Sequence, residues 1–216
     1  AMTATPDTVA SIPESLRLAA AEDPDLEAIV DGEIRLTFAQ LDAEVTAFAR
    51  SAVARGLEPG DRAAVWAPNS ARWCIAALGI MAAGGILTPI NTRYLGSEAQ
   101  FALNRARTMM LVTEEGFLGK SYLTMLRETE APTGDDWGAG VEPAILPGVP
   151  YLRTIVDIGS TGDEHATDWD DFIALGESVD PSVIDERIAG LTPDKIADIL
   201  FTSGTTGYPK GAMVTH

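Results

Sequence analysis

Residues 63–90 read AAVWAPNSARWCIAALGIMAAGGILTPI and contain a complete strand–helix–strand pattern. The apolar run at residues 63–67 predicts a short buried strand, and residues 68–70 (Pro-Asn-Ser) are typical of the opening of a helix. The glycines at residues 84–85 end that helix, and residues 87–90 predict a second buried strand. Two strands joined by a helix are typical of neighbours in a parallel sheet.

A membrane span is the alternative interpretation of part of this stretch. Residues 73–92 contain no charged side chain, and their number alone is enough to cross a bilayer. The two glycines, Pro89 and Asn91 instead divide the stretch into a helix, a turn and a short strand. We therefore expect no transmembrane segment here.

The alternation of strands and helices continues on both sides of residues 63–90. Helices are expected at residues 11–21, 38–55 and 97–104, and strands at residues 28–30, 34–38, 109–113 and 152–158. Thr37 and Gln40 have the spacing of a capping box for the second of these helices. Proline and glycine dominate residues 131–150 and predict a surface excursion. The fold class predicted is α/β, with a mostly parallel sheet covered by helices on both faces.

The charge balance excludes several classes of protein. The chain has 216 residues, 32 acidic and 15 basic side chains, and a net charge of −17. We expect no nucleic-acid partner, because this charge repels phosphate backbones and no cluster of basic residues is present. Cys74 is the one cysteine, which excludes a disulfide scaffold and favours a buried structural thiol over a reactive one. The first residues lack a signal-peptide pattern, so a cytoplasmic location is predicted.

Residues 163–171 carry the most acidic stretch of the chain's second half. Trp169 and Phe172 are expected to anchor a short helix to the core. Three carboxylates of this stretch could bind a cation, namely Asp168, Asp170 and Asp171. They lack the spacing of a calcium loop, so a solvated surface is the prediction and no metal site is expected.

The stretch that says most about function follows a further apolar strand, expected at residues 196–201. Residues 202–211 read TSGTTGYPKG. Glycines let a backbone approach polyphosphate closely, hydroxyl groups add donors, and Lys210 adds a compact positive charge. A P-loop is excluded by the spacing, and the dinucleotide pattern of glycines is absent. A surface turn would explain the glycines but not three hydroxyl side chains followed by Pro-Lys-Gly.

This loop resembles the AMP-binding signature of the adenylate-forming superfamily, which includes acyl-CoA synthetases, luciferases and the adenylation domains of peptide synthetases. Shorter blocks upstream follow the family's order: residues 36–41, 60–62, 68–70, 83–85 and 89–91. The resemblance therefore covers most of the chain.

The resemblance implies a two-step reaction. A carboxylic acid and ATP, with Mg²⁺, give an acyl-adenylate and pyrophosphate, and coenzyme A then displaces AMP. The residues that would hold the ATP phosphates are Thr202, Ser203, Gly204, Thr205, Thr206, Gly207 and Lys210. His216 matches a histidine near the acyl pocket, although a plain strand-end histidine explains it equally well. No acid–base catalytic residue is assigned within the chain.

Family members run to several hundred residues, and the segments that bind adenine, ribose and magnesium follow the loop. We therefore expect residues 1–190 to be the first α/β lobe, residues 191–216 to begin the next unit, and the chain to be inactive alone. The full protein is expected to be an acid–CoA ligase for fatty or related acyl groups, with homo-oligomerisation expected from exposed sheet edges. An enzyme that loads a carrier protein and a non-catalytic binding module remain the alternatives.

Overall fold

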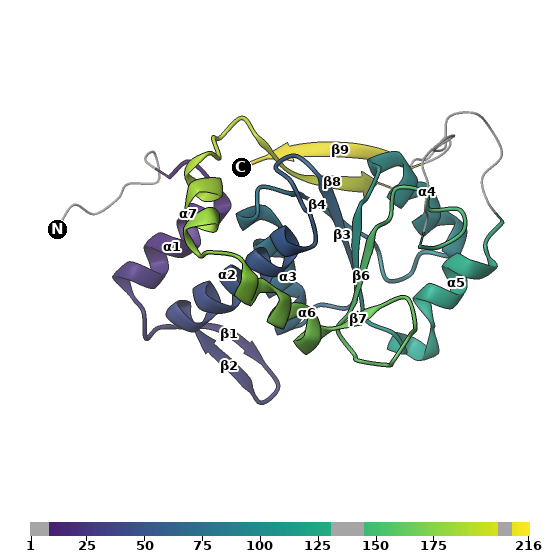
Figure 1. Cartoon of the computed structure of the whole chain (residues 1–216), viewed down its shortest axis with the longest axis horizontal. Helices are drawn as coiled ribbons and strands as arrows, with labels where there is room; N and C mark the ends of the chain where they lie inside the picture. Colours follow the sequence, from purple (N-terminus) through teal and green to yellow (C-terminus); the bar gives the residue numbers. More distant parts are fainter. Residues whose placement is uncertain (1–8, 131–144, 203–208) are drawn as a thin grey trace.

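The computed structural model describes residues 9–130, 145–202 and 209–216 (Figure 1). The helices of the described residues are α1 (Ile12–Glu22), α2 (Phe38–Ala54), α3 (Ala71–Ala82), α4 (Gly96–Ala106), α5 (Tyr122–Glu128), α6 (Trp169–Leu175) and α7 (Ser182–Ala189), with short 3₁₀ turns at Phe117–Gly119 and Gly176–Ser178. The strands are β1 (Glu27–Asp31), β2 (Ile34–Thr37), β3 (Arg62–Trp66), β4 (Ile86–Pro89), β5 (Met110–Thr113), β6 (Thr154–Asp157), β7 (Thr167–Asp168), β8 (Ile196–Thr202) and β9 (Lys210–Thr215).

The strands form two sheets. β1 and β2 make a separate antiparallel hairpin, and the main sheet has the order β7-β6-β5-β3-β4-β8-β9. Every neighbouring pair in the main sheet is parallel except β8 and β9, which run antiparallel. The predicted fold class is confirmed.

Helices cover both faces of the sheet, and each face has its own core (Figure 1). One core joins β3, β5 and β6 to α1, α2, α3, α6 and α7, with Phe48 fully buried against Trp169 and Phe172. The other joins the same strands to α4 and α5, where Trp66 stacks on Tyr122 with ring centroids 4.2 Å apart. Successive residues of a strand point to opposite faces, so each buried strand supplies both cores.

Local signals place most helix starts correctly. The Gln40 amide donates to the Thr37 hydroxyl at 3.3 Å, and the Thr37 amide donates to the Gln40 side chain at 2.9 Å, which completes the predicted capping box. Ser70 caps α3 by accepting from the Trp73 amide. The uncharged stretch at residues 73–92 lies mainly in α3 and β4. None of the helices in the described residues is long and apolar enough to cross a membrane.

Three features differ from the predictions or go beyond them. α5, α7 and β7 were not predicted, because they are short and lack a clear periodicity. Cys74 is only half-buried, which corrects the expectation of a buried thiol; burial and the nearby Asp31 raise its pKa. β8 pairs with β4 inside the main sheet, and the division at residue 190 stays a prediction.

Candidate functional site

The carboxyl ends of the parallel strands meet at one edge of the sheet. β4 and β5 lie on opposite sides of β3, so the strand order reverses at β3. In open α/β sheets, ligands bind at this edge, next to such a reversal. The topology therefore favours this edge, where β8 also ends, as the place for chemistry.

Thr202 and Lys210 lie at this edge. The register of the β8–β9 hairpin pairs these two residues directly. The Thr202 hydroxyl donates to the Lys210 carbonyl oxygen at 3.5 Å. The Lys210 side chain is exposed, and it makes no ion pair with any residue that the structure describes. The other predicted phosphate-binding residues lie outside the described residues: Ser203, Gly204, Thr205, Thr206 and Gly207.

His216 lies at the opposite edge of the sheet. Its backbone amide donates to the Lys195 carbonyl at 3.1 Å, and its Nδ1 accepts from the Ile12 amide at the start of α1 at 3.3 Å. Burial lowers the pKa of the imidazole. The six residues of β9 separate His216 from the Lys210 end by about 20 Å at the usual rise per residue. The structure thus does not bring these two predicted site residues together, and the acyl-pocket role of His216 stays a prediction.

Two hollows flank the carboxyl end of β8, one on each face of the sheet. The first, of about 310 Å³, lies among the ends of β3, β4 and β8 and includes Trp73, Asn91 and Leu200. The Asn91 side chain accepts from the backbone amide of Arg93 there at 2.9 Å. The second, of about 570 Å³, lies between α4 and the hairpin and includes Lys210.

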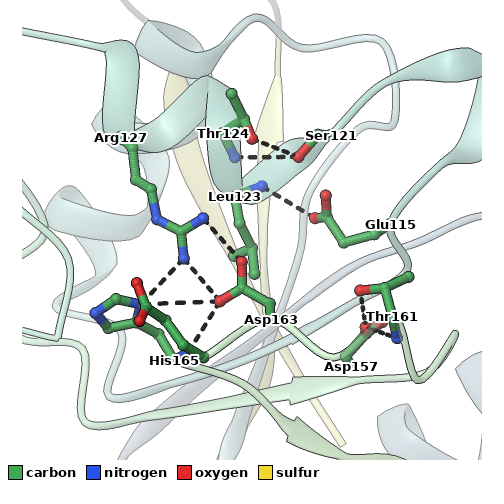
Figure 2. A network of polar contacts seen from close by, with 10 residues as sticks. Glu115, Ser121, Leu123, Thr124, Arg127, Asp157, Thr161, Asp163 and His165 are labelled. Carbon is green, nitrogen blue, oxygen red and sulfur yellow. Dashed lines mark hydrogen bonds and ion pairs between the residues drawn. The ribbon is translucent and has the colours of Figure 1, made fainter.

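A polar network that sequence reasoning missed lies beyond the ends of β5 and β6 (Figure 2). The Arg127 guanidinium donates to both oxygens of Asp163, at 2.8 and 2.7 Å, and lies 3.2 Å from His165 Nδ1. These hydrogen bonds lower the pKa of Asp163 and raise that of Arg127. Residues 36 positions apart leave no local pattern, so only the fold reveals this pair.

The rest of the network secures loops at the same edge. The Glu115 carboxylate accepts from the Leu123 amide at 3.0 Å and so holds the start of α5. Asp157 is fully buried and accepts from the amides of Gly159 and Thr161. The network therefore fixes the loop after β6 against α5 (Figure 2).

The acidic stretch has structural partners in the described chain. Asp170 lies 3.6 Å from Arg72, and Trp169 and Phe172 bury α6 as predicted. Within residues 9–130, 145–202 and 209–216, no group of three His, Cys, Asp or Glu side chains could hold a metal ion.

Comparison with known proteins gives a consistent result. Residues 16–216 match the family model described as AMP-binding enzyme. A protein of Rhodococcus jostii (strain RHA1), named as a 3-(7a-methyl-1,5-dioxo-octahydro-1H-inden-4-yl)propanoyl:CoA ligase, is 42% identical over 215 residues, which are 100% of this chain and 39% of that protein. Its namesake from Mycobacterium tuberculosis (strain ATCC 25618 / H37Rv) is 35% identical over 206 residues, 95% of this chain and 36% of that protein.

A solved structure agrees with the fold. The anthranilate CoA ligase AuaEII in complex with anthranoyl-AMP matches 94% of this chain and 34% of that one, with a TM-score of 0.72 and 22% identity. The chain therefore spans less than two fifths of the length of these proteins.

Proposed function

Because its residues 16–216 match that model, the chain belongs to the AMP-binding enzyme family, and we propose that it is part of an ATP-dependent acyl-CoA ligase. The observation that carries the proposal is that the family match runs through the β8–β9 hairpin, including Thr202 and Lys210. The names of the two bacterial relatives, both CoA ligases, support coenzyme A as the acceptor over a carrier protein.

The reaction consists of two displacements. A carboxylate oxygen attacks the α-phosphorus of ATP, the bond to pyrophosphate breaks, and an acyl-adenylate forms. The thiol sulfur of coenzyme A then attacks the acyl carbon, AMP leaves with the bonding electron pair, and the thiol proton passes to solvent. Two anions must meet in the first step, so fixed positive charge and hydrogen-bond donors lower its barrier.

The proposal gives Lys210 a role in the first step. Within the described residues it makes no ion pair, and it lies at the carboxyl edge of a chain whose net charge of −17 would otherwise repel ATP. Its role would be to hold the pyrophosphate portion, together with Thr202, Ser203, Gly204, Thr205, Thr206 and Gly207. Mg²⁺ would accompany ATP in this step, and no residue of this chain is assigned to hold it.

Three further statements belong to this proposal. The single cysteine, Cys74, supports a reducing, cytoplasmic location. The exposed edge strand β9 supports self-association of the chain. Residues 1–190 and 191–216 would then belong to successive units of the ligase, and this chain alone would not complete the reaction.

Equilibrium binding of ATP to the 216-residue chain tests the phosphate site. We expect Lys210→Ala to weaken ATP binding by about tenfold or more, because a charge-assisted contact to phosphate is lost. Lys195→Ala is the matched control, since it removes the same charge at the opposite edge of the sheet. Equal affinities of the two variants would refute the assignment. ATP-dependent hydroxamate formation by this chain would contradict its expected inactivity.

A further inference from the structure

The end of β8 extends past the strand beside it. β4 and β8 run parallel, with Leu87 opposite Asp198. β4 ends two residues after Leu87, at Pro89, whereas β8 continues four residues after Asp198, to Thr202. Among the described residues, no strand therefore lies beside Phe201 and Thr202 on the β4 side, and a backbone carbonyl on this side needs a partner from elsewhere.

The segment between β4 and α4 supplies such a partner. The Tyr94 hydroxyl donates to the Phe201 carbonyl oxygen at 3.4 Å. Tyr94 is half-buried, and it packs with Phe201 against the core on the α4 side of the sheet. Burial and the Glu98 carboxylate raise the pKa of the Tyr94 hydroxyl, so this group keeps its proton and can donate across the neutral range.

Buried side chains hold the segment that carries Tyr94. The Trp66 indole, at the end of β3, donates to the Asn91 carbonyl at 3.1 Å, and the Tyr94 amide donates to the same oxygen at 3.0 Å. The Tyr122 hydroxyl donates to the Thr92 carbonyl at 3.2 Å, and its ring stacks on Trp66. Both rings are fully buried. Tyr94 therefore links the end of β8 to a segment that the core fixes.

We propose that Tyr94 is a positioning residue for the ATP phosphates, because its bond to the Phe201 carbonyl holds the end of β8 and, with it, the pair of Thr202 and Lys210. The proposal rests on the proposed function and adds a residue 107 positions before Phe201. Tyr94 acts through the backbone of β8 and not by contact with ATP. Donors that are already held in place pay less ordering cost when a ligand binds.

A purely structural role is the alternative, since any satisfied hydrogen bond adds to stability. Tyr122 supplies the matched control. Its hydroxyl also donates to a backbone carbonyl, and the acceptor lies in the same segment between β4 and α4, at Thr92 and not in β8. Tyr94→Phe and Tyr122→Phe thus remove the same kind of bond and keep the ring, but only Tyr94→Phe releases β8.

Equilibrium binding of ATP to the 216-residue chain, measured together with urea unfolding, separates the two roles. We expect Tyr94→Phe to weaken ATP binding about two- to fivefold, which corresponds to one neutral hydrogen bond. Tyr122→Phe should lower the urea midpoint at least as much as Tyr94→Phe, because Tyr122 is fully buried, and should leave ATP affinity unchanged. Circular dichroism checks that both variants fold.

Amide hydrogen exchange without ATP tests the same link to β8. Loss of the Tyr94 hydroxyl should allow the end of β8 to open more often. We expect exchange at this end to be about two- to fivefold faster in Tyr94→Phe than in Tyr122→Phe.

The proposal is overturned if Tyr94→Phe and Tyr122→Phe bind ATP equally well while Lys210→Ala binds it more weakly; the phosphate site then stands without Tyr94. Equal exchange at the end of β8 in the two tyrosine variants also overturns it. If ATP does not bind, or if Lys210→Ala binds it as the parent does, the proposed function fails instead. Hydrogen exchange then still decides whether Tyr94 holds the end of β8.

Discussion

Replacing Gly96 with alanine is expected to destabilise the chain by forcing α4 away from α5. A Cβ atom on Gly96 would collide with the Met125 carbonyl oxygen and the Thr129 hydroxyl at the end of α5. That hydroxyl already donates to the same carbonyl at 2.7 Å, so neither group can move without loss of a hydrogen bond. The clash therefore requires a shift of one helix.

The magnitude follows from two opposing effects. Overpacking a buried contact costs about 1–3 kcal/mol. Gly96 has no left-handed backbone conformation, so alanine recovers about 0.4–1 kcal/mol by restricting the unfolded chain. The net loss should be about 1–2 kcal/mol, which lowers the urea midpoint by about 0.5 M for a slope of about 2–3 kcal/mol/M.

Urea unfolding followed by tryptophan fluorescence measures this change, with Gly190→Ala as the control. A Cβ on Gly190 would lie 3.5 Å from the carbonyl oxygens of Glu186 and Arg187, which is an ordinary contact, so its midpoint should not fall. A Gly96→Ala midpoint at or above that of Gly190→Ala would refute the reasoning.

Two further predictions concern pH and ion pairing. Burial lowers the pKa of His216 below its ordinary value of 6.5, so as the pH falls the unfolded chain takes up a proton before the folded chain does. Folding stability should therefore be full above pH 6.5 and decline below it. Replacing His216 with glutamine should reduce this decline, measured as the urea midpoint against pH. Arg127→Gln should cost about 1–2 kcal/mol at neutral pH, because Asp163 loses both guanidinium hydrogen bonds and keeps only that from the His165 amide. Because Arg127 lowers the pKa of Asp163, the difference in urea midpoint between parent and variant should shrink as the pH falls below the ordinary value of 3.8, and a constant difference would argue against the pair.

Sequence reasoning succeeded where the cause of a structure is local. The capping box of Thr37 and Gln40 involves residues three positions apart, and the buried face of α2 repeats at helical spacing. Runs of apolar residues between turn signals located β3 and β4 to within about a residue or two. The phosphate-binding residues also come from a contiguous pattern, and their role stays a prediction.

Sequence reasoning failed where distant segments meet. Nothing near Arg127 indicates Asp163, because a salt bridge between helix α5 and the loop after β6 depends on how the sheet brings β5 and β6 together. The position of His216 also depends on how the sheet is built. It follows Lys210 closely in sequence, yet β9 carries it to the opposite edge, where it contacts α1. Closeness in sequence is a poor guide to closeness in space along an extended strand.

Among the described residues, helices cover the two faces of the sheet unequally. Five helices contribute to the core on one face, whereas α4 and α5 contribute to the core on the other. β8 and β9 lie beyond β4, so α4 reaches only part of their face and leaves Met213 largely exposed.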